Sequence, residues 1–168
     1  MPTDHPVLRR LLRGIALVED GLLIVLLALM IALAAAQIFM RNVLGSGVTG
    51  ADQLLKLLVL WLGMLGAIAA SRGDRHINID ILSRFLATRA RLLCRLVVDL
   101  FAALVCGLIA VHAARFVHTE YEAGVTAFGR MPAWITELIL PVAFTLIALR
   151  YVVMFFADLR RLRGGTPP

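Results

Sequence analysis

An uncharged apolar run of 20 residues, from Gly21 to Met40, constrains this chain more than any other feature of its sequence. At about 1.5 Å per residue, an α-helix of that length crosses a hydrocarbon core about 30 Å thick. Backbone amides in lipid must be satisfied within the segment, and the run lacks the alternation of barrel strands. We therefore expect a transmembrane helix. The composition of the whole chain also indicates a membrane protein, because 61% of its residues are hydrophobic and its mean hydropathy is +0.90.

A cleaved signal peptide is the alternative for this run, because Arg9, Arg10 and Arg13 precede it and three consecutive alanines near its end imitate a cleavage site. Against that interpretation, Glu19 and Asp20 stand directly before the run. The run is also long enough to span a bilayer unbroken. We interpret the three arginines as a cytoplasmic anchor.

Three further apolar segments predict an all-α membrane protein with four transmembrane helices. The spans are expected at about 21–40, 54–71, 96–114 and 133–157, with a short glycine-rich turn after the first. This divides the chain into a cytoplasmic segment at 1–20, a transmembrane domain at 21–157 and a cytoplasmic tail at 158–168. The tail is expected to fray into water from Arg160 onward.

The expected orientation follows from the basic residues outside the spans. One side of the membrane collects 11 arginines, whereas the other has Arg41, Arg115 and Arg130. Both termini are therefore expected in the cytoplasm. The net charge of +6 originates in this asymmetry, so a nucleic-acid partner need not be invoked.

Apolar and basic side chains share the connection between the second and third spans at roughly helical spacing. The pattern predicts an amphipathic helix over about 80–95, lying along the cytoplasmic interface. Asp80 or Ser83 can cap its start. His76 can donate a hydrogen bond to a carbonyl at the end of the second span.

Ionisable side chains inside the spans cost about 2.5 to 3.5 kcal/mol each, so each needs a partner or a function. Depth along the helices brings Asp99 near Arg150 at the cytoplasmic end, and Lys56 near Glu137 at the outer end. Their places near the span ends favour contacts between helices or subunits over an ion path. Local pairs four residues apart are the alternatives, Arg95 with Asp99 and Asp52 with Lys56.

Small residues on the second span form two overlapping patterns, Gly63 with Ala67 and Gly66 with Ala70. Such a face lets another helix approach closely. It fits packing within the four-helix unit and packing against a partner equally well.

Catalysis and cofactor binding are not expected. Cys94 and Cys106 lie about 18 Å apart along one predicted helix, so they cannot form a disulfide. The sequence has no metal-ligand spacing and no nucleophile arrangement. It also lacks histidines at matched depth on two spans, which a haem-binding membrane subunit requires. His112 is interpreted as a polar residue near the membrane interface.

Two stretches resemble a known family. Residues 51–80 contain an acidic residue opening the second span, a tryptophan and a Gly-Ala pair within it, and a His-Ile-x-x-Asp turn after it. Residues 131–150 contain a Pro-x-Trp entry to the last span. Together they resemble the small membrane subunit, the DctQ-type protein, of tripartite ATP-independent periplasmic (TRAP) transporters, over about residues 20–160. The matching positions are Asp52, Trp61, Gly66, Ala67, His76, Ile77, Asp80, Pro132, Trp134, Pro141 and Arg150.

The candidate structural or subunit-interface residues are Asp52, Lys56, Trp61, Gly63, Gly66, Arg72, His76, Asp80, Asp99, Pro132, Trp134, Glu137 and Arg150. The chain departs from the family pattern at Ala51 and Asp52, where paired glutamates are frequent, and at Lys56, where arginine is frequent. These departures affect the polar contacts expected there.

The resemblance implies a scaffold in the bacterial inner membrane. Its partners would be a large membrane subunit, which holds substrate and ions, and a periplasmic solute-binding protein. Together they would import a small organic acid with a sodium gradient. One alternative is a four-helix exporter of the multidrug type, which needs an acid in the first helix, and residues 21–40 contain none. The other is a membrane anchor of a redox enzyme, for which the paired histidines are missing.

Overall fold

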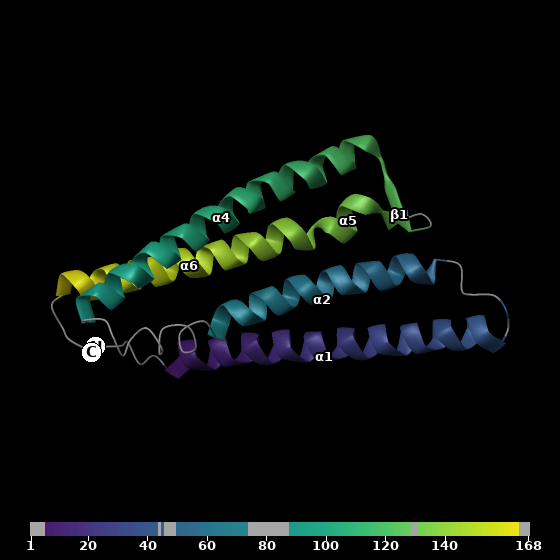
Figure 1. Ribbon diagram of the computed structural model, residues 1–168, viewed down its shortest axis with the longest axis horizontal. Helices are drawn as coiled ribbons and strands as arrows, with labels where there is room; N and C mark the ends of the chain where they lie inside the picture. The colour runs from purple at the N-terminus through teal and green to yellow at the C-terminus, as the bar shows by residue number, and fades with distance from the viewer. Residues whose placement is uncertain (1–5, 44, 46–49, 74–87, 129–130, 165–168) are drawn as a thin grey trace.

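The computed structural model describes residues 6–43, 45, 50–73, 88–128 and 131–164. Within this part, four helical segments are long and apolar enough to cross a membrane, which confirms the expected class (Figure 1). The last crossing is made by two consecutive helices, and an antiparallel strand pair precedes it. The elements are α1 (Pro6–Val43), α2 (Ala51–Gly73), α4 (Thr88–Ala123), β1 (Thr126–Phe128), β2 (Met131–Pro132), α5 (Ala133–Glu137) and α6 (Ile139–Gly164).

The helices extend beyond the spans predicted from hydropathy. α1 begins at Pro6 and so includes most of the expected N-terminal segment. α6 continues to Gly164, so residues 160–164 are helical where fraying was expected, and 165–168 lie outside the described residues. Residues 88–95 of the expected interfacial helix form the first turns of α4, and 80–87 lie outside the described residues. Hydropathy marks the edge of the hydrocarbon, whereas a helix satisfies its own backbone in water and in lipid alike.

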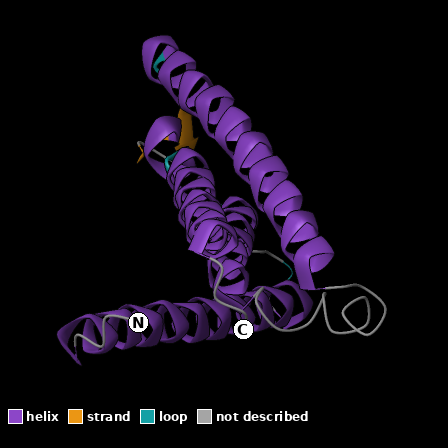
Figure 2. Ribbon diagram, turned by 90° about the vertical axis from the view of Figure 1, so that its left-hand side faces the viewer, coloured by secondary structure: helices purple, strands orange, loops and turns teal. Residues whose placement is uncertain are grey.

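The helices pack as an open row and not as a closed bundle. The main contacts join α1 to α2, α2 to α6, and α6 to α4. Figure 2 shows α1 and α4 on opposite sides of the central helices. Each outer helix therefore packs on one side only, and its other faces are exposed.

α4 packs against α6 through a narrow seam whose buried residues recur at every seventh position. A seven-residue repeat keeps one seam turned toward a neighbouring helix along its whole length. Alanine at two of the four positions lets the two backbones approach closely. The buried seam residues are Leu96, Ala103, Ala110 and Val117.

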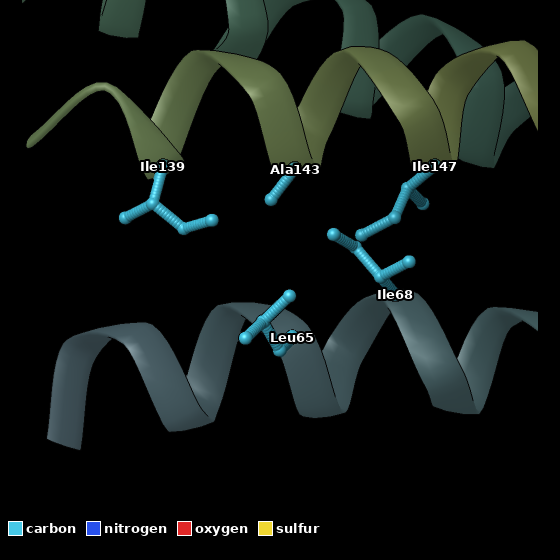
Figure 3. Packing of buried hydrophobic residues seen from close by; sticks show 5 residues of the cluster. All are labelled: Leu65, Ile68, Ile139, Ala143 and Ile147. Atoms are coloured by element: carbon cyan, nitrogen blue, oxygen red, sulfur yellow. The ribbon is translucent and has the colours of Figure 1, made fainter. Parts of the chain in front are cut away.

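The apolar core lies between α2 and α6 (Figure 3). Ala143 is fully buried there, with 0% of its surface exposed. Leu23 and Leu26 of α1 and Cys106 of α4 pack against the same core, so it joins all four long helices. Its buried residues are Leu65, Ile68, Ile139, Ala143 and Ile147.

Pro141 explains the interruption between α5 and α6 at Leu138. Proline has no N–H to donate to the carbonyl four residues earlier, which belongs to Glu137, and its ring crowds that carbonyl. α5 accordingly ends at Glu137. The Leu138 N–H still donates to the Trp134 carbonyl at 3.1 Å, and the Val142 N–H donates to the Leu138 carbonyl at 3.3 Å. The chain therefore crosses the break without leaving the direction of the last span.

Candidate functional site

The guanidinium of Arg150 on α6 bonds to two other helices of the row, α1 and α2. Its Nη2 donates to Oε1 of Glu19 on α1 at 3.1 Å. Its Nη1 donates to Oγ of Ser71 on α2 at 2.8 Å and to the carbonyl of Ile68. The planar fork of arginine suits this task, because its donors point in fixed and different directions. One side chain thereby fixes α1, α2 and α6 relative to one another.

Arg72 on α2 adds a second set of contacts to α1. Its Nε lies 3.0 Å from Oε2 of Glu19, an ion pair without hydrogen-bond alignment. Its Nη2 donates to Oδ1 of Asp20. Glu19 therefore bridges two arginines with its two carboxylate oxygens. We call this group of five residues the three-helix cluster: Glu19, Asp20, Ser71, Arg72 and Arg150.

Burial distinguishes the members of the three-helix cluster. The side chains of Glu19 and Arg150 are 17% and 25% exposed, whereas that of Asp20 is 57% exposed. Ser71 is buried, and its hydroxyl donates to the Ile68 carbonyl at 2.7 Å. Two carboxylates balance two guanidinium groups, which lowers the cost of holding these charges at the edge of a membrane. The two contacts of Glu19, with Arg72 and with Arg150, are thus about equally shielded, and both are more shielded than the Arg72–Asp20 pair.

The partner expected for Arg150 was Asp99, and the structure gives Glu19, which lay in the predicted N-terminal segment. Arg150 follows Ala143 and Ile147 by seven and three residues, so it shares the face of α6 that packs on α2. Asp99 is half-buried on the seam of α4, on the other flank of α6. A count of depth gives the level of a residue in the membrane but not the direction in which its side chain points.

The predicted pairing of Lys56 with Glu137 is wrong. Lys56 is exposed on α2 and makes no ion pair with any described residue, so the local pair with Asp52 is not formed either. Oδ1 of Asp52 instead accepts a hydrogen bond from Nε2 of Gln37 at 3.3 Å. Glu137 is half-buried on α5, and its Oε2 is buried without a hydrogen-bond partner among the described residues.

The aromatic residues singled out by the sequence hold the opposite end of the row together. Nε1 of Trp61 on α2 donates to the Thr136 carbonyl on α5 at 3.0 Å. The Trp134 ring meets the Tyr121 ring of α4 edge to face, with centroids 5.6 Å apart. Pro132 takes an extended conformation at the start of α5. Trp61 and Trp134 therefore link α2 and α4 to the entry of the last span.

The remaining candidates divide into three groups. Gly63 is exposed and Gly66 is half-buried on α2, and a Cβ atom at either would meet no atom within 4 Å. His76 and Asp80, with the predicted helix cap, lie outside the described residues. Cys94 and Cys106 are free thiols. In the described ranges, no three His, Cys, Asp or Glu side chains gather to hold a metal ion.

Sequence reasoning missed Glu19, Asp20 and Ser71 as contact residues. The available signal was the acidic pair directly before the first apolar run, at the end where two later spans bring Arg72 and Arg150. A balance of charges at that end predicts contact, but it does not name the pairs.

Comparison with known proteins gives one family. The profile described as "Tripartite ATP-independent periplasmic transporters, DctQ component" matches residues 20–161. The chain is 30% identical over 131 residues to the C4-dicarboxylate TRAP transporter small permease protein DctQ of Rhodobacter capsulatus, covering 77% of this chain and 57% of that one. It is 31% identical over 131 residues to the protein of the same name from Pseudomonas aeruginosa, covering 73% and 60%.

A longer relative matches as well. The sialic acid TRAP transporter permease protein SiaT of Haemophilus influenzae is 30% identical over 118 residues, which cover 70% of this chain but 19% of SiaT. The matched region is thus less than two thirds of the length of each of these relatives. The region matched by the family profile, residues 20–161, includes all of α2 and α4 and most of α1 and α6.

Proposed function

This chain belongs to the DctQ family of TRAP transporter components, and we propose that it is the small scaffold subunit of such a transporter. Its partners are a large membrane subunit, which binds the substrate and the coupling ions, and a periplasmic solute-binding protein. The assembly imports a small organic acid with a sodium gradient across the bacterial inner membrane. The names of the relatives, which include C4-dicarboxylates and sialic acid, support an organic acid as the substrate class.

The three-helix cluster is the observation that favours a scaffold. A transport site needs polar groups that are free to bind cargo, whereas Glu19, Arg72 and Arg150 are bonded to one another across helices. Such contacts fix the angle and the register of the helices. The exposed apolar faces of the open row are available to lipid and to another membrane protein. Fixed helices and exposed apolar faces suit a scaffold that packs against a larger membrane subunit.

The multidrug-type exporter is not favoured, although the argument from sequence against it was incomplete. α1 begins at Pro6 and therefore contains two acids, Glu19 and Asp20, which the predicted span excluded. Both carboxylate oxygens of Glu19 contact arginines and Asp20 pairs with Arg72, so neither carboxylate is open to a cationic drug. A redox anchor is not favoured either. His112 and His118, the histidines within the described residues, are both on α4 and cannot face each other from two helices.

The connections at the end opposite the three-helix cluster are the proposed docking site for the solute-binding protein. The C-terminal end of α1, the start of α2 and the strand β1 before α5 lie at the same end of the row (Figure 1). Gly124 ends α4 with a φ of 62°, a left-handed conformation that glycine adopts without strain. Glu120 and Glu122 lie in the last turns of α4 beside this corner, and rim charges of this kind chiefly accelerate association.

Reconstitution tests the proposed function. The chain would be co-expressed with a large TRAP membrane permease from the same organism, purified, and placed in vesicles with a TRAP solute-binding protein from that organism. Uptake of labelled C4-dicarboxylates and sialic acid would then be measured with and without a sodium gradient. We expect co-purification, and uptake that requires all three proteins and sodium. Uptake that is unchanged when this chain is omitted would contradict a scaffold role.

A further inference from the structure

α2 carries an exposed stripe that no part of the described chain covers. From Lys56 onward, every exposed residue of α2 lies on one side of the helix, at spacings of three or four. Leu58 and Leu65 are buried on the opposite side, against the rest of the row. We call this stripe the α2 open face, and its residues are Lys56, Val59, Gly63, Ala67 and Ala70.

The α2 open face differs in composition from the other exposed surfaces. Among the described residues, α1 and α4 each expose twelve large hydrophobic side chains and α6 exposes six, whereas α2 exposes Val59 alone. α1 also exposes alanines, among them Ala32, but beside Ile31 and Ile38. Faces rich in large aliphatic and aromatic side chains suit lipid, whereas small residues mark contacts between membrane helices, because they let backbones approach.

Space along this face agrees with its composition. A Cβ atom built on Gly63 would meet no atom within 4 Å, so packing inside this chain does not require a glycine there. From the sequence, the pattern of Gly63 with Ala67 fitted packing within this chain and packing against a partner equally well. Because both residues are exposed, the structure favours packing against a partner. The small residues are therefore open to a helix from another protein.

Lys56 gives the contact an electrostatic character. It lies five residues inside α2, is exposed on the same face, and forms no ion pair with the described residues. A cation within a span is costly without a partner, and nearby Asp52 accepts a hydrogen bond from Gln37 of α1 instead. A carboxylate on a helix packed against the α2 open face would form an ion pair with the Lys56 ammonium group.

We propose that the α2 open face is the contact surface for a transmembrane helix of the large membrane subunit, and that this helix has a carboxylate opposite Lys56. The inference rests on the proposed function, which supplies that partner. A second copy of this chain fits less well. Two copies inserted in the same direction and packed symmetrically through this face would bring the two Lys56 ammonium groups to the same depth.

A matched pair of substitutions tests the surface in the intact complex. Ala67→Leu places a large side chain on the α2 open face, whereas Ala114→Leu makes the same change on an exposed position of α4. We expect Ala67→Leu to lower the amount of large subunit that co-purifies by about tenfold, the scale of one good interhelical contact in a membrane. Ala114→Leu is expected to leave it unchanged.

The outcomes separate this inference from the proposed function. If the unmodified chain does not co-purify with the large subunit, both are wrong. If it does, and the two leucine variants retain the large subunit equally, the α2 open face is not the interface while the scaffold role stands. Charge is tested in the same assay, where Lys56→Glu should lose the large subunit and Lys56→Arg should keep it. If the two variants retain the same amount of large subunit, the partner helix has no carboxylate opposite Lys56.

Photo-crosslinking identifies the occupant without relying on a destabilising change. Benzoylphenylalanine would replace Ala67 in one variant and Ala114 in another, and each complex would be irradiated in membranes. We expect an adduct with the tagged large subunit from position 67 and none from position 114. An adduct of position 67 with a second copy of this chain, or with lipid alone, would overturn the proposal.

Discussion

Nη2 of Arg150 and Oε1 of Glu19 are separated by 131 positions in the sequence and by 3.1 Å in the structure. Their contact ties the last span to the first, two helices that otherwise have α2 between them. Because Arg150 also bonds to Ser71 and to the Ile68 carbonyl, its removal would take one donor from each of three acceptors, although the Ile68 carbonyl would keep the Ser71 hydroxyl. The three-helix cluster is therefore where we expect substitutions to have the largest effect on the geometry of the row.

Arg150→Gln should destabilise the purified chain by about 1 to 3 kcal/mol, the range for losing hydrogen bonds to charged groups. Arg150→Lys should lose much of the same stability, because a single ammonium does not reproduce the fork that reaches α1 and α2 together. Thermal unfolding in detergent, followed by intrinsic tryptophan fluorescence, measures both. Arg160→Gln is the control, since Arg160 is exposed on α6 and has no ion pair in the described structure.

A double-mutant cycle of Glu19→Gln and Arg150→Gln measures the coupling between these two residues directly. We expect the double variant to be more stable than the sum of the two single losses predicts, since each single change leaves a partly buried charge without its partner. Strictly additive losses would mean that the contact at 3.1 Å contributes nothing specific.

Ala143→Leu should destabilise the chain by about 1 to 3 kcal/mol, the usual cost of extra methylenes in a well-packed core. Ala143 is fully buried between α2 and α6, so a larger side chain must push these helices apart (Figure 3). Unfolding midpoints in detergent test the effect. Ala114→Leu makes the same change on an exposed face of α4, and a similar loss there would point to a general effect of leucine.

Trp61→Phe should cost about 0.5 to 1.5 kcal/mol, because the ring is kept while the bond from Nε1 to the Thr136 carbonyl is lost. Trp134→Phe retains an edge-to-face partner for Tyr121, and Trp134 has no indole hydrogen bond in the described structure. It should therefore cost less than Trp61→Phe. Circular dichroism during thermal unfolding gives the ranking, and the reverse order would assign the larger role to the aromatic pair.

Both termini are predicted to lie in the cytoplasm. In a background without Cys94 and Cys106, a single cysteine at Thr126 should react with an impermeant thiol reagent added to intact cells. A cysteine at Arg160 should react only after the cells are opened. The expectation rests on the eleven-to-three distribution of arginine. Labelling of position 160 with position 126 protected would invert the orientation.

Sequence by itself determined the class of this protein and the number of its membrane crossings. Each span is a local property, because the length and the apolar content of one continuous segment decide whether it can cross a bilayer. The run from Gly21 to Met40 needed no knowledge of the rest of the chain. The ends of the helices were not determined in this way, since α1 continues back through Glu19 to Pro6, where polar residues remain helical in water.

The tertiary structure decided which faces of the helices meet. Depth along a helix follows from counting residues, but the direction of a side chain toward a particular neighbour depends on the order in which the helices pack. The row places α1 and α2 on one flank of α6 and α4 on the other. Arg150 therefore contacts Glu19, and Lys56 and Gly63 remain on an open face. Side-chain pairing between helices is long-range in sequence, and no local pattern encodes it.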